Sequence, residues 1–186
     1  MTRHWVADQL FTRGMIQFGR FRQENSIALM RMQLEFAASH PQFLNDLADE
    51  MLSLLNIKGF ERLVSPIDAV PLASLLSVKT GVPLVYSRGS GNFTSADLIG
   101  AYYVGHPACL VLLDGQGAQQ HMALWIKNAL AAGLQIECVV GVIGEPESSA
   151  VAANYLFTTR DLLQSLSDQR LVPPHVVQSV LSQRGE

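Results

Sequence analysis

Two unbroken apolar runs constrain the fold more than any other feature of this chain. They are CLVLL, residues 109–113, and CVVGVI, residues 138–143. A strand with one face in water alternates apolar and polar side chains, so runs without alternation indicate strands that are covered on both faces. Such strands belong to parallel sheets that carry helices on either side. The two runs therefore predict an α/β fold.

Other segments alternate between helical and extended patterns, as a parallel sheet with crossover helices requires. The expected helices cover residues 5–18, a segment between Ser39 and Gly59 with Ser39 as its cap, residues 70–80 and residues 119–132. The expected strands cover residues 27–34, 62–67, 82–87, 97–104, 108–114 and 136–144. Gly81 and Gly133 follow two of the helices, where a glycine favours the end of a helix. The pattern predicts a mostly parallel central sheet flanked by helices.

Composition narrows the class of protein. Apolar residues make up 48% of the 186 residues and the net charge is -3, which argues against a nucleic-acid-binding surface. The two cysteines, Cys109 and Cys138, lie inside apolar runs and are expected to be buried, reduced thiols rather than a disulfide or a metal site. No apolar run approaches the roughly 20 residues of a membrane span, so we expect a cytoplasmic protein.

The loops that follow the strands are the candidate site, because ligands of parallel sheets bind at the carboxyl ends of the strands. These loops cover residues 65–69, 87–92, 114–120 and 144–148. The third has the shape of a phosphate–ribose loop, since Asp114 is followed by Gly115 and Gly117 and then by a helix. Backbone N–H groups at the start of a helix attract anions.

Four segments in this order resemble the orotate phosphoribosyltransferase family. They are LFTRGMIQFGRF, SHPQFLNDLADEML, SPIDAVPLASLLSVKTGVPLVYSRG and NYLFTTRDLLQSL, and the resemblance extends over residues 8–166. It implies a type I phosphoribosyltransferase-like fold with a small N-terminal hood segment. It also implies a homodimer that forms through strand and helix faces near the N-terminal region, for which IALMRMQLEF is suitably apolar.

This resemblance suggests one domain with three parts. We expect residues 1–38 to form an N-terminal helix and the strands of the hood, residues 39–166 to form the α/β core, and residues 167–186 to add a C-terminal helix. That helix would pack on the domain or on a partner chain.

Enzymes of the family transfer ribose 5-phosphate from PRPP to orotate with the help of Mg²⁺. Their loop carries paired acids for the ribose, then threonines and glycines for the 5′-phosphate. Here Leu113 stands in place of the first acid, and only Asp114 remains. Gly117 and Ala118 replace the two threonines, and glutamines replace the two glycines. We therefore expect a weaker grip on the phosphate.

Cationic side chains are lost as well. Gly89 and Asn92 stand where the resemblance places lysines, so that Arg88 keeps the only charge of that segment. Glu24 and Glu145 replace a lysine and an arginine on the orotate side, and both are expected to be solvated unless they face a new cationic ligand. At about 4 Å, each such reversal turns an attraction of about 1–4 kcal/mol for an anionic substrate into a repulsion of similar size.

The candidate site residues are the loop residues that keep a suitable chemistry despite these replacements. Asp114 is the candidate catalytic residue, and no metal ligand is proposed. The candidate substrate or phosphate contacts are Arg88, Gly115, Gly117, Gln119, Gln120 and Asp68. Each of the charged residues has a structural alternative: Asp114 can cap the helix that follows it, Arg88 can form a surface or dimer salt bridge, and Asp68 can hold a turn.

Three functions remain open at this point. The favoured one is a non-catalytic, orotate phosphoribosyltransferase-like protein that binds a small phosphorylated ligand or nucleotide weakly, or acts in regulation. The second is an active transferase for orotate or another base, which would use PRPP and Mg²⁺. The third is a structural subunit that dimerises with an active paralogue.

Overall fold

The computed structural model describes residues 3–23, 26–88, 93–114, 119–145 and 151–184. A six-stranded sheet forms its centre, with the strand order β5-β4-β3-β6-β7-β8. All neighbouring strands are parallel except β4 and β5, so the predicted α/β fold with a mostly parallel sheet is confirmed. The strands are β3 (Arg62–Ser65), β4 (Leu84–Ser87), β5 (Leu98–Ile99), β6 (His106–Asp114), β7 (Leu134–Ile143) and β8 (Ala152–Phe157).

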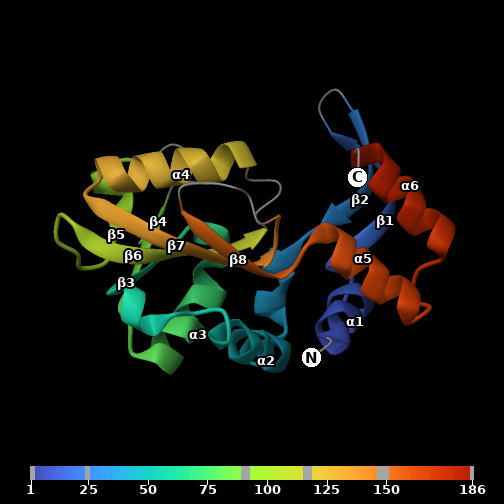
Figure 1. Ribbon diagram of the computed structural model, residues 1–186, viewed down its shortest axis with the longest axis horizontal. Helices are drawn as coiled ribbons and strands as arrows, with labels where there is room; N and C mark the ends of the chain where they lie inside the picture. The colour runs from blue at the N-terminus through green and yellow to red at the C-terminus, as the bar shows by residue number, and fades with distance from the viewer. Residues whose placement is uncertain (1–2, 24–25, 89–92, 115–118, 146–150, 185–186) are drawn as a thin grey trace.

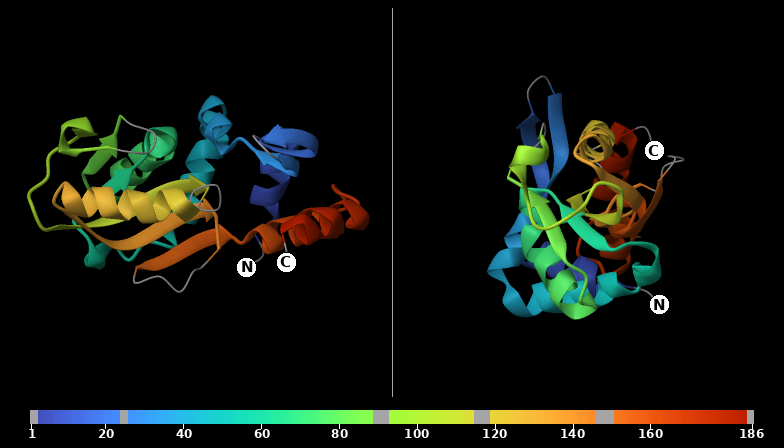
Figure 2. Two further views of the ribbon diagram at one scale, coloured as in Figure 1. Left: turned by 90° about the horizontal axis from the view of Figure 1, so that it is seen from above. Right: turned by 90° about the vertical axis from the view of Figure 1, so that its left-hand side faces the viewer.

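Helices cover both faces of this sheet (Figure 1). Helices α2 (Pro41–Leu52) and α3 (Val70–Thr80) lie on one face, and α4 (Gln119–Ala131) lies on the other. The antiparallel hairpin of β1 (Ile16–Gln23) and β2 (Ser26–Met32) forms a separate two-stranded sheet on the side toward which β6 and β8 run. Of the remaining α-helices, α1 (His4–Thr12) and α6 (Pro174–Arg184) contact this hairpin, and α5 (Thr159–Asp168) contacts both of these helices (Figures 1 and 2).

Strand β6 shows why its sequence is apolar without alternation. Cys109, Val111 and Leu113 join the buried cluster that contains α2 and α3. The intervening residues Leu110 and Leu112 join the buried cluster beneath α4. Because successive side chains of a strand point to opposite faces, both faces of β6 are buried, as the sequence predicted.

The N-terminal segment departs from the prediction. The expected helix over residues 5–18 is wrong in its second half, because α1 ends at Thr12 and β1 begins at Ile16. Gly14 lies between them with a φ of 75°. This left-handed conformation favours glycine and reverses the chain, so the apolar residues after it belong to a strand.

Other boundaries also needed correction. Ser39 does not cap α2: it ends a 3₁₀ helix (Leu34–Ser39), and His40 occupies the cap position. The expected strand over residues 97–104 is limited to the two residues of β5. The sequence pattern does not indicate strand β8, because the polar Asn154 interrupts AANYLF and leaves no unbroken apolar run.

The two cysteines are free thiols on adjacent strands, Cys109 buried and Cys138 partly buried. They are paired in register because β7 accommodates an extra residue, Glu137, between Ile136 and Cys138. The hydrogen bond from Cys109 to Cys138 and burial together raise the pKa of the Cys109 thiol. Among the described residues, no helix is long and apolar enough to cross a membrane.

Candidate functional site

The carboxyl ends of the parallel strands meet at one edge of the sheet, on the side of the β1–β2 hairpin (Figure 1). Ser65 ends β3, Ser87 ends β4 and Asp114 ends β6. We call this region the carboxyl edge. The loops that the sequence marked as the candidate site start here.

The structure places some of the candidate residues and leaves others undescribed. Asp114 is partly buried at the end of β6 and has a polar partner, while Arg88 and Asp68 are exposed. Gln119 and Gln120 open α4. Gly115 and Gly117 lie outside the described residues, as does Glu24. The phosphate-binding roles of these residues therefore remain predictions.

The residue before Asp114 points into the core. Leu113, which stands in place of the first acid, is 5% exposed and belongs to the cluster that contains α2 and α3. A carboxylate there would be surrounded by apolar side chains, where an unpaired charge is costly. This position therefore contributes packing and leaves Asp114 as the carboxylate at the end of β6.

The turn after β3 is held by its own carboxylate. Asp68 lies in a 3₁₀ helix (Ile67–Ala69) and accepts a hydrogen bond from the backbone N–H of Ala69 at 3.1 Å. At the end of β3, the hydroxyl of Ser65 is fully buried and makes no hydrogen bond to a described residue. The described part of this turn contains no cationic side chain that could hold a pyrophosphate.

The segment after β4 is anchored by an aromatic side chain. Phe93 is 5% exposed, and its ring centroid lies 4.2 Å from that of Trp125 on α4. Both rings belong to the buried cluster on the α4 face of the sheet. The resemblance implies a mobile, lysine-bearing loop in this region, whereas Phe93 attaches the chain to α4 through buried apolar contacts.

A capping box continues this anchored segment toward β5. The backbone N–H and the hydroxyl of Thr94 both donate to the carboxylate of Asp97, at 2.8 and 3.0 Å. These two hydrogen bonds lower the pKa of Asp97, and the nearby positive charge of Arg88 adds to the effect. The charge of Arg88, a candidate phosphate contact, thus lies close to a carboxylate of its own chain.

Glu145 also has a structural partner. Its carboxylate accepts a hydrogen bond of 3.0 Å from the backbone N–H of Thr159, in the first turn of α5. The expectation that Glu145 is solvated holds only in part, because this side chain is partly buried and binds the backbone at the start of a helix that Thr158 caps. A carboxylate suits this position, since the start of a helix carries partial positive charge. An arginine here would oppose that charge.

Tyr155 of β8 packs on bare backbone near the end of β7. A Cβ atom added to Gly141 would lie 2.7 Å from the Tyr155 ring, and the ring is also too close to Gly144 for a Cβ there. The Tyr155 hydroxyl approaches the sulfur of Met122 on α4 at 3.6 Å. Sequence reasoning missed this residue, although a glycine inside the apolar run of β7 signals a close approach of this kind.

The described residues at the carboxyl edge do not by themselves make a dedicated Mg²⁺ site. Mg²⁺ prefers oxygen ligands, carboxylates above all. Leu113 faces the core, and Asp68 is exposed and bonded within its turn. Among the described residues, no three histidine, cysteine, aspartate or glutamate side chains come together as metal ligands.

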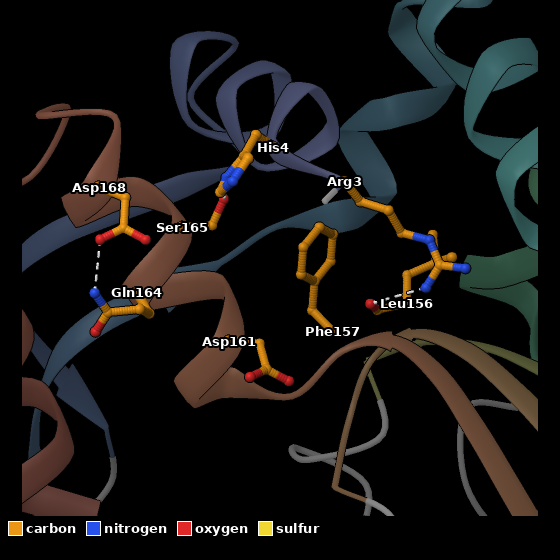
Figure 3. A pocket seen from close by; sticks show the side chains of 8 residues that line it. All are labelled: Arg3, His4, Leu156, Phe157, Asp161, Gln164, Ser165 and Asp168. Atoms are coloured by element: carbon orange, nitrogen blue, oxygen red, sulfur yellow. Dashed lines mark hydrogen bonds between the residues drawn. The ribbon is translucent and has the colours of Figure 1, made fainter. Parts of the chain in front are cut away.

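A groove of about 320 Å³ lies where α1 and α5 meet the end of β8 (Figure 3). Its polar groups already bond to one another: His4 Nδ1 lies 2.7 Å from Ser165 Oγ, and the Gln164 amide donates to Asp168 at 2.7 Å. Asp161 is a second carboxylate in its lining. Two carboxylates disfavour a phosphorylated ligand, so this groove does not replace the carboxyl edge as a phosphate site.

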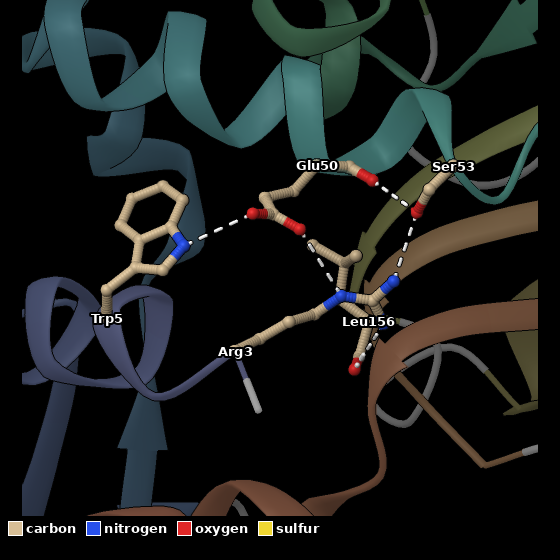
Figure 4. Close-up of polar contacts among 5 residues, drawn as sticks. All are labelled: Arg3, Trp5, Glu50, Ser53 and Leu156. Carbon is tan, nitrogen blue, oxygen red and sulfur yellow. Dashed lines mark hydrogen bonds and ion pairs between the residues drawn. The ribbon is translucent and has the colours of Figure 1, made fainter. Parts of the chain in front are cut away.

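The one arginine that lines the groove is committed to a structural network (Figure 4). Arg3 forms an ion pair of 3.4 Å with Glu50 and donates to Ser53 at 3.0 Å. It also donates to the carbonyl of Leu156 at 3.3 Å, and the Trp5 indole donates to Glu50 at 3.2 Å. These contacts join the start of α1 to the end of α2 and to β8, which fixes the N-terminal segment on the core.

Comparison with known proteins supports the fold. UMP synthase of Leishmania donovani superimposes with a TM-score of 0.81 at 20% identity, over 98% of this chain and 43% of that chain. The orotate phosphoribosyltransferases of Aeropyrum pernix and Francisella tularensis superimpose with TM-scores of 0.70 and 0.64, at 15% and 14% identity. They cover 87% and 100% of this chain and 99% and 96% of their own.

A curated sequence relative points the same way. The orotate phosphoribosyltransferase of Methanopyrus kandleri is 33% identical over 90 residues, which are 47% of this chain. The chain spans about half the length, 48%, of this relative. No family model matches the chain.

The architecture defines the protein as one with the type I phosphoribosyltransferase fold. Within that class, the relatives named above confirm the resemblance to orotate phosphoribosyltransferases that the four sequence segments indicated. The low identity agrees with a divergent chain.

Proposed function

We propose that this protein is a non-catalytic, orotate phosphoribosyltransferase-like protein associated with pyrimidine nucleotide metabolism. Its carboxyl edge binds a small phosphorylated ligand weakly, through Asp114, Arg88 and the start of α4. The role is regulatory. We also propose that it is cytoplasmic and forms a homodimer, as the family resemblance implies.

The structural use of the residues at the carboxyl edge supports this proposal. Leu113 packs in the core, Phe93 packs against Trp125 on α4 and Glu145 binds the backbone at the start of α5. In an enzyme for PRPP, these regions would hold an acid, a mobile lysine-bearing loop and a cation. The loss of electrostatic groups that stabilise a transition state lowers the catalytic rate directly, because such groups supply much of the rate enhancement of enzymes.

An active transferase is the second candidate, and two observations favour it. Asp114 is present at the end of β6, and the likeness to the Methanopyrus kandleri enzyme reaches 33% over 90 residues. In such an enzyme, Asp114 would hold the ribose of PRPP, and its negative charge would favour the cation-like transition state. The cations that bind the pyrophosphate would then have to come from elsewhere, such as a partner chain.

Turnover separates these two candidates. The protein is incubated with orotate, PRPP and Mg²⁺, and the fall in orotate absorbance is followed against a blank without protein. We expect no turnover above the blank. Turnover that disappears in Asp114→Asn would overturn the non-catalytic proposal, and Asp46→Asn is the matched control because Asp46 accepts a hydrogen bond from Gln42 of its own helix, α2.

Thermal stability distinguishes a ligand-binding protein from a purely structural partner of an active paralogue. A ligand that binds the folded state stabilises it by RT ln(1 + [L]/Kd), which is about 2.7 kcal/mol at 100 times Kd. We expect a small rise in melting temperature with nucleoside monophosphates or PRPP at millimolar concentration. The absence of a shift with PRPP, nucleoside monophosphates and sulfate would favour the structural role.

A further inference from the structure

The two cysteines lie side by side on the face of the sheet that α2 and α3 cover. Cys109 of β6 and Cys138 of β7 are register partners, and both contact the buried cluster of that face. Neighbouring strands of a sheet lie about 4.8 Å apart. This separation falls within the range of about 4.4–6.8 Å that the Cα atoms of a disulfide span. The two thiols are therefore placed where oxidation can join them.

An irregularity of β7 brings about this pairing. Ala108 pairs with Ile136, and Cys109 pairs with Cys138, so that Glu137 is an extra residue on β7. In a regular ladder Cys109 would pair with Glu137. The Cys138 side chain would then point to the α4 face, because successive side chains of a strand alternate. A bulge re-aims side chains in this manner, and here it sets two sulfur atoms on the same face.

Burial decreases along the row of paired residues that contains the two cysteines. Leu63 of β3 and Cys109 are fully buried, Cys138 is partly exposed, and Ala152, its partner on β8, is exposed. Strand β8 is the edge strand of the sheet, and Ala152 is its first residue. The small side chain of alanine covers little of its neighbour. Cys138 is therefore the sulfur that a small oxidant can reach, whereas Cys109 is enclosed.

The hydrogen bond between the two thiols gives them different reactivity. The thiolate is the nucleophilic form of a cysteine. Cys109 donates a hydrogen bond to Cys138, which lowers the pKa of the Cys138 thiol, whereas burial and the charge of Glu137 oppose this effect. The same hydrogen bond and burial raise the pKa of Cys109. Exposure and the hydrogen bond thus both mark Cys138 as the attacking sulfur.

We propose that Cys109 and Cys138 form a peroxide-reactive dithiol, which a hydroperoxide converts reversibly into an intramolecular disulfide. The Cys138 thiolate attacks one oxygen of the hydroperoxide, the O–O bond breaks, and the other oxygen leaves as an alcohol, or as water, after taking a proton from solvent. Cys138 is then a sulfenic acid, oxidised by two electrons. The Cys109 sulfur attacks the Cys138 sulfur, the S–O bond breaks, and water leaves with the thiol proton of Cys109.

Peptide mapping under non-reducing conditions tests the proposal. The folded protein is treated with hydrogen peroxide, the remaining thiols are alkylated, and the protein is digested with trypsin. We expect the intact chain to lose the mass of two hydrogen atoms. We expect the peptides of residues 89–127 and 128–160 to be joined until dithiothreitol separates them. Two unmodified thiols would overturn the proposal, as would a bond that forms only between two chains or only in urea.

Single-cysteine variants test the order of attack. In Cys109→Ala the second thiol is absent, so we expect the sulfenic acid of Cys138 to persist and to react with dimedone. In the matched variant Cys138→Ala, Cys109 stays buried, and we expect no dimedone adduct while the protein is folded. Equal labelling of the two variants would overturn the assigned roles. Circular dichroism checks that both variants fold, and the peptide map of the wild-type protein decides the proposal if either does not.

Discussion

The interior of the central sheet and its carboxyl edge carry different parts of the family resemblance. In the interior, β6 and β7 keep apolar side chains on both faces, and the fold superimposes on that of known phosphoribosyltransferases. At the carboxyl edge, the described residues lie in regions that the family would use to bind ligands. Here these residues contact other parts of their own chain. The fold can thus persist while the residues at the carboxyl edge change. Burial of apolar side chains stabilises the interior, whereas ligand binding at the edge needs only a few charged groups.

Substitution of a core residue tests the interior and should have the largest effect. Leu110 lies at the centre of β6 and is fully buried beneath α4. We expect Leu110→Ala to lower the free energy of unfolding by about 4 kcal/mol, through lost burial and a residual cavity. Urea denaturation measures the change. Val78→Ala, at an 81% exposed position of α3, should change it by less than about 0.5 kcal/mol.

Phe93 tests whether the segment after β4 is a structural anchor. We expect Phe93→Ala to destabilise the protein by about 3 kcal/mol, since the ring is buried against Trp125. Urea denaturation gives the change, and tryptophan fluorescence should shift because Trp125 becomes more hydrated. Phe93→Leu should restore most of the stability. A mobile catalytic loop would instead tolerate alanine with little loss.

The contact between Tyr155 and β7 has a sharper test. Gly141→Ala places a methyl group against the Tyr155 ring, and we expect a loss of about 2 kcal/mol from overpacking. Tyr155→Leu should reduce that loss when the two changes are combined. Additive effects in the double-mutant cycle would show that the ring does not pack on Gly141.

Glu145 should show a smaller effect. Glu145→Gln keeps an oxygen for the Thr159 amide but removes the negative charge at the start of α5, and we expect a loss of about 0.5 to 1 kcal/mol. Glu145→Arg should cost more than Glu145→Gln. A gain of stability in the arginine variant would indicate that Glu145 faces other anions and is not a helix cap.

The pH dependence associated with Asp97 is the smallest effect. Its pKa lies below the unfolded value of 3.8 because Thr94 donates two hydrogen bonds to the carboxylate. Its contribution to stability is therefore complete above pH 3.8 and is lost as the pH falls through the lower folded pKa. Asp97→Asn should weaken the acid dependence of unfolding below pH 3.8. An acid dependence of unfolding that is unchanged in Asp97→Asn would contradict this assignment.

The interior of the sheet could be predicted from the sequence, whereas the contacts of the residues at the carboxyl edge could not. The doubly buried strands follow from unbroken apolar runs, and α3 occupies residues 70–80 as expected because Gly81 ends it. In contrast, the partners of Glu145 and Phe93 lie on distant segments, Thr159 and Trp125. Sequence patterns record the missing cations but do not show which contacts replaced them.

Equilibrium binding of PRPP in the presence of Mg²⁺ tests most directly whether the carboxyl edge has lost the ability to bind the substrate of the family's enzymes. Titration calorimetry on the full chain should show no saturable binding tighter than a Kd of about 1 mM, which corresponds to about −4 kcal/mol. Binding with a micromolar Kd that Asp114→Asn abolishes and Asp46→Asn preserves would contradict the proposed loss of the site.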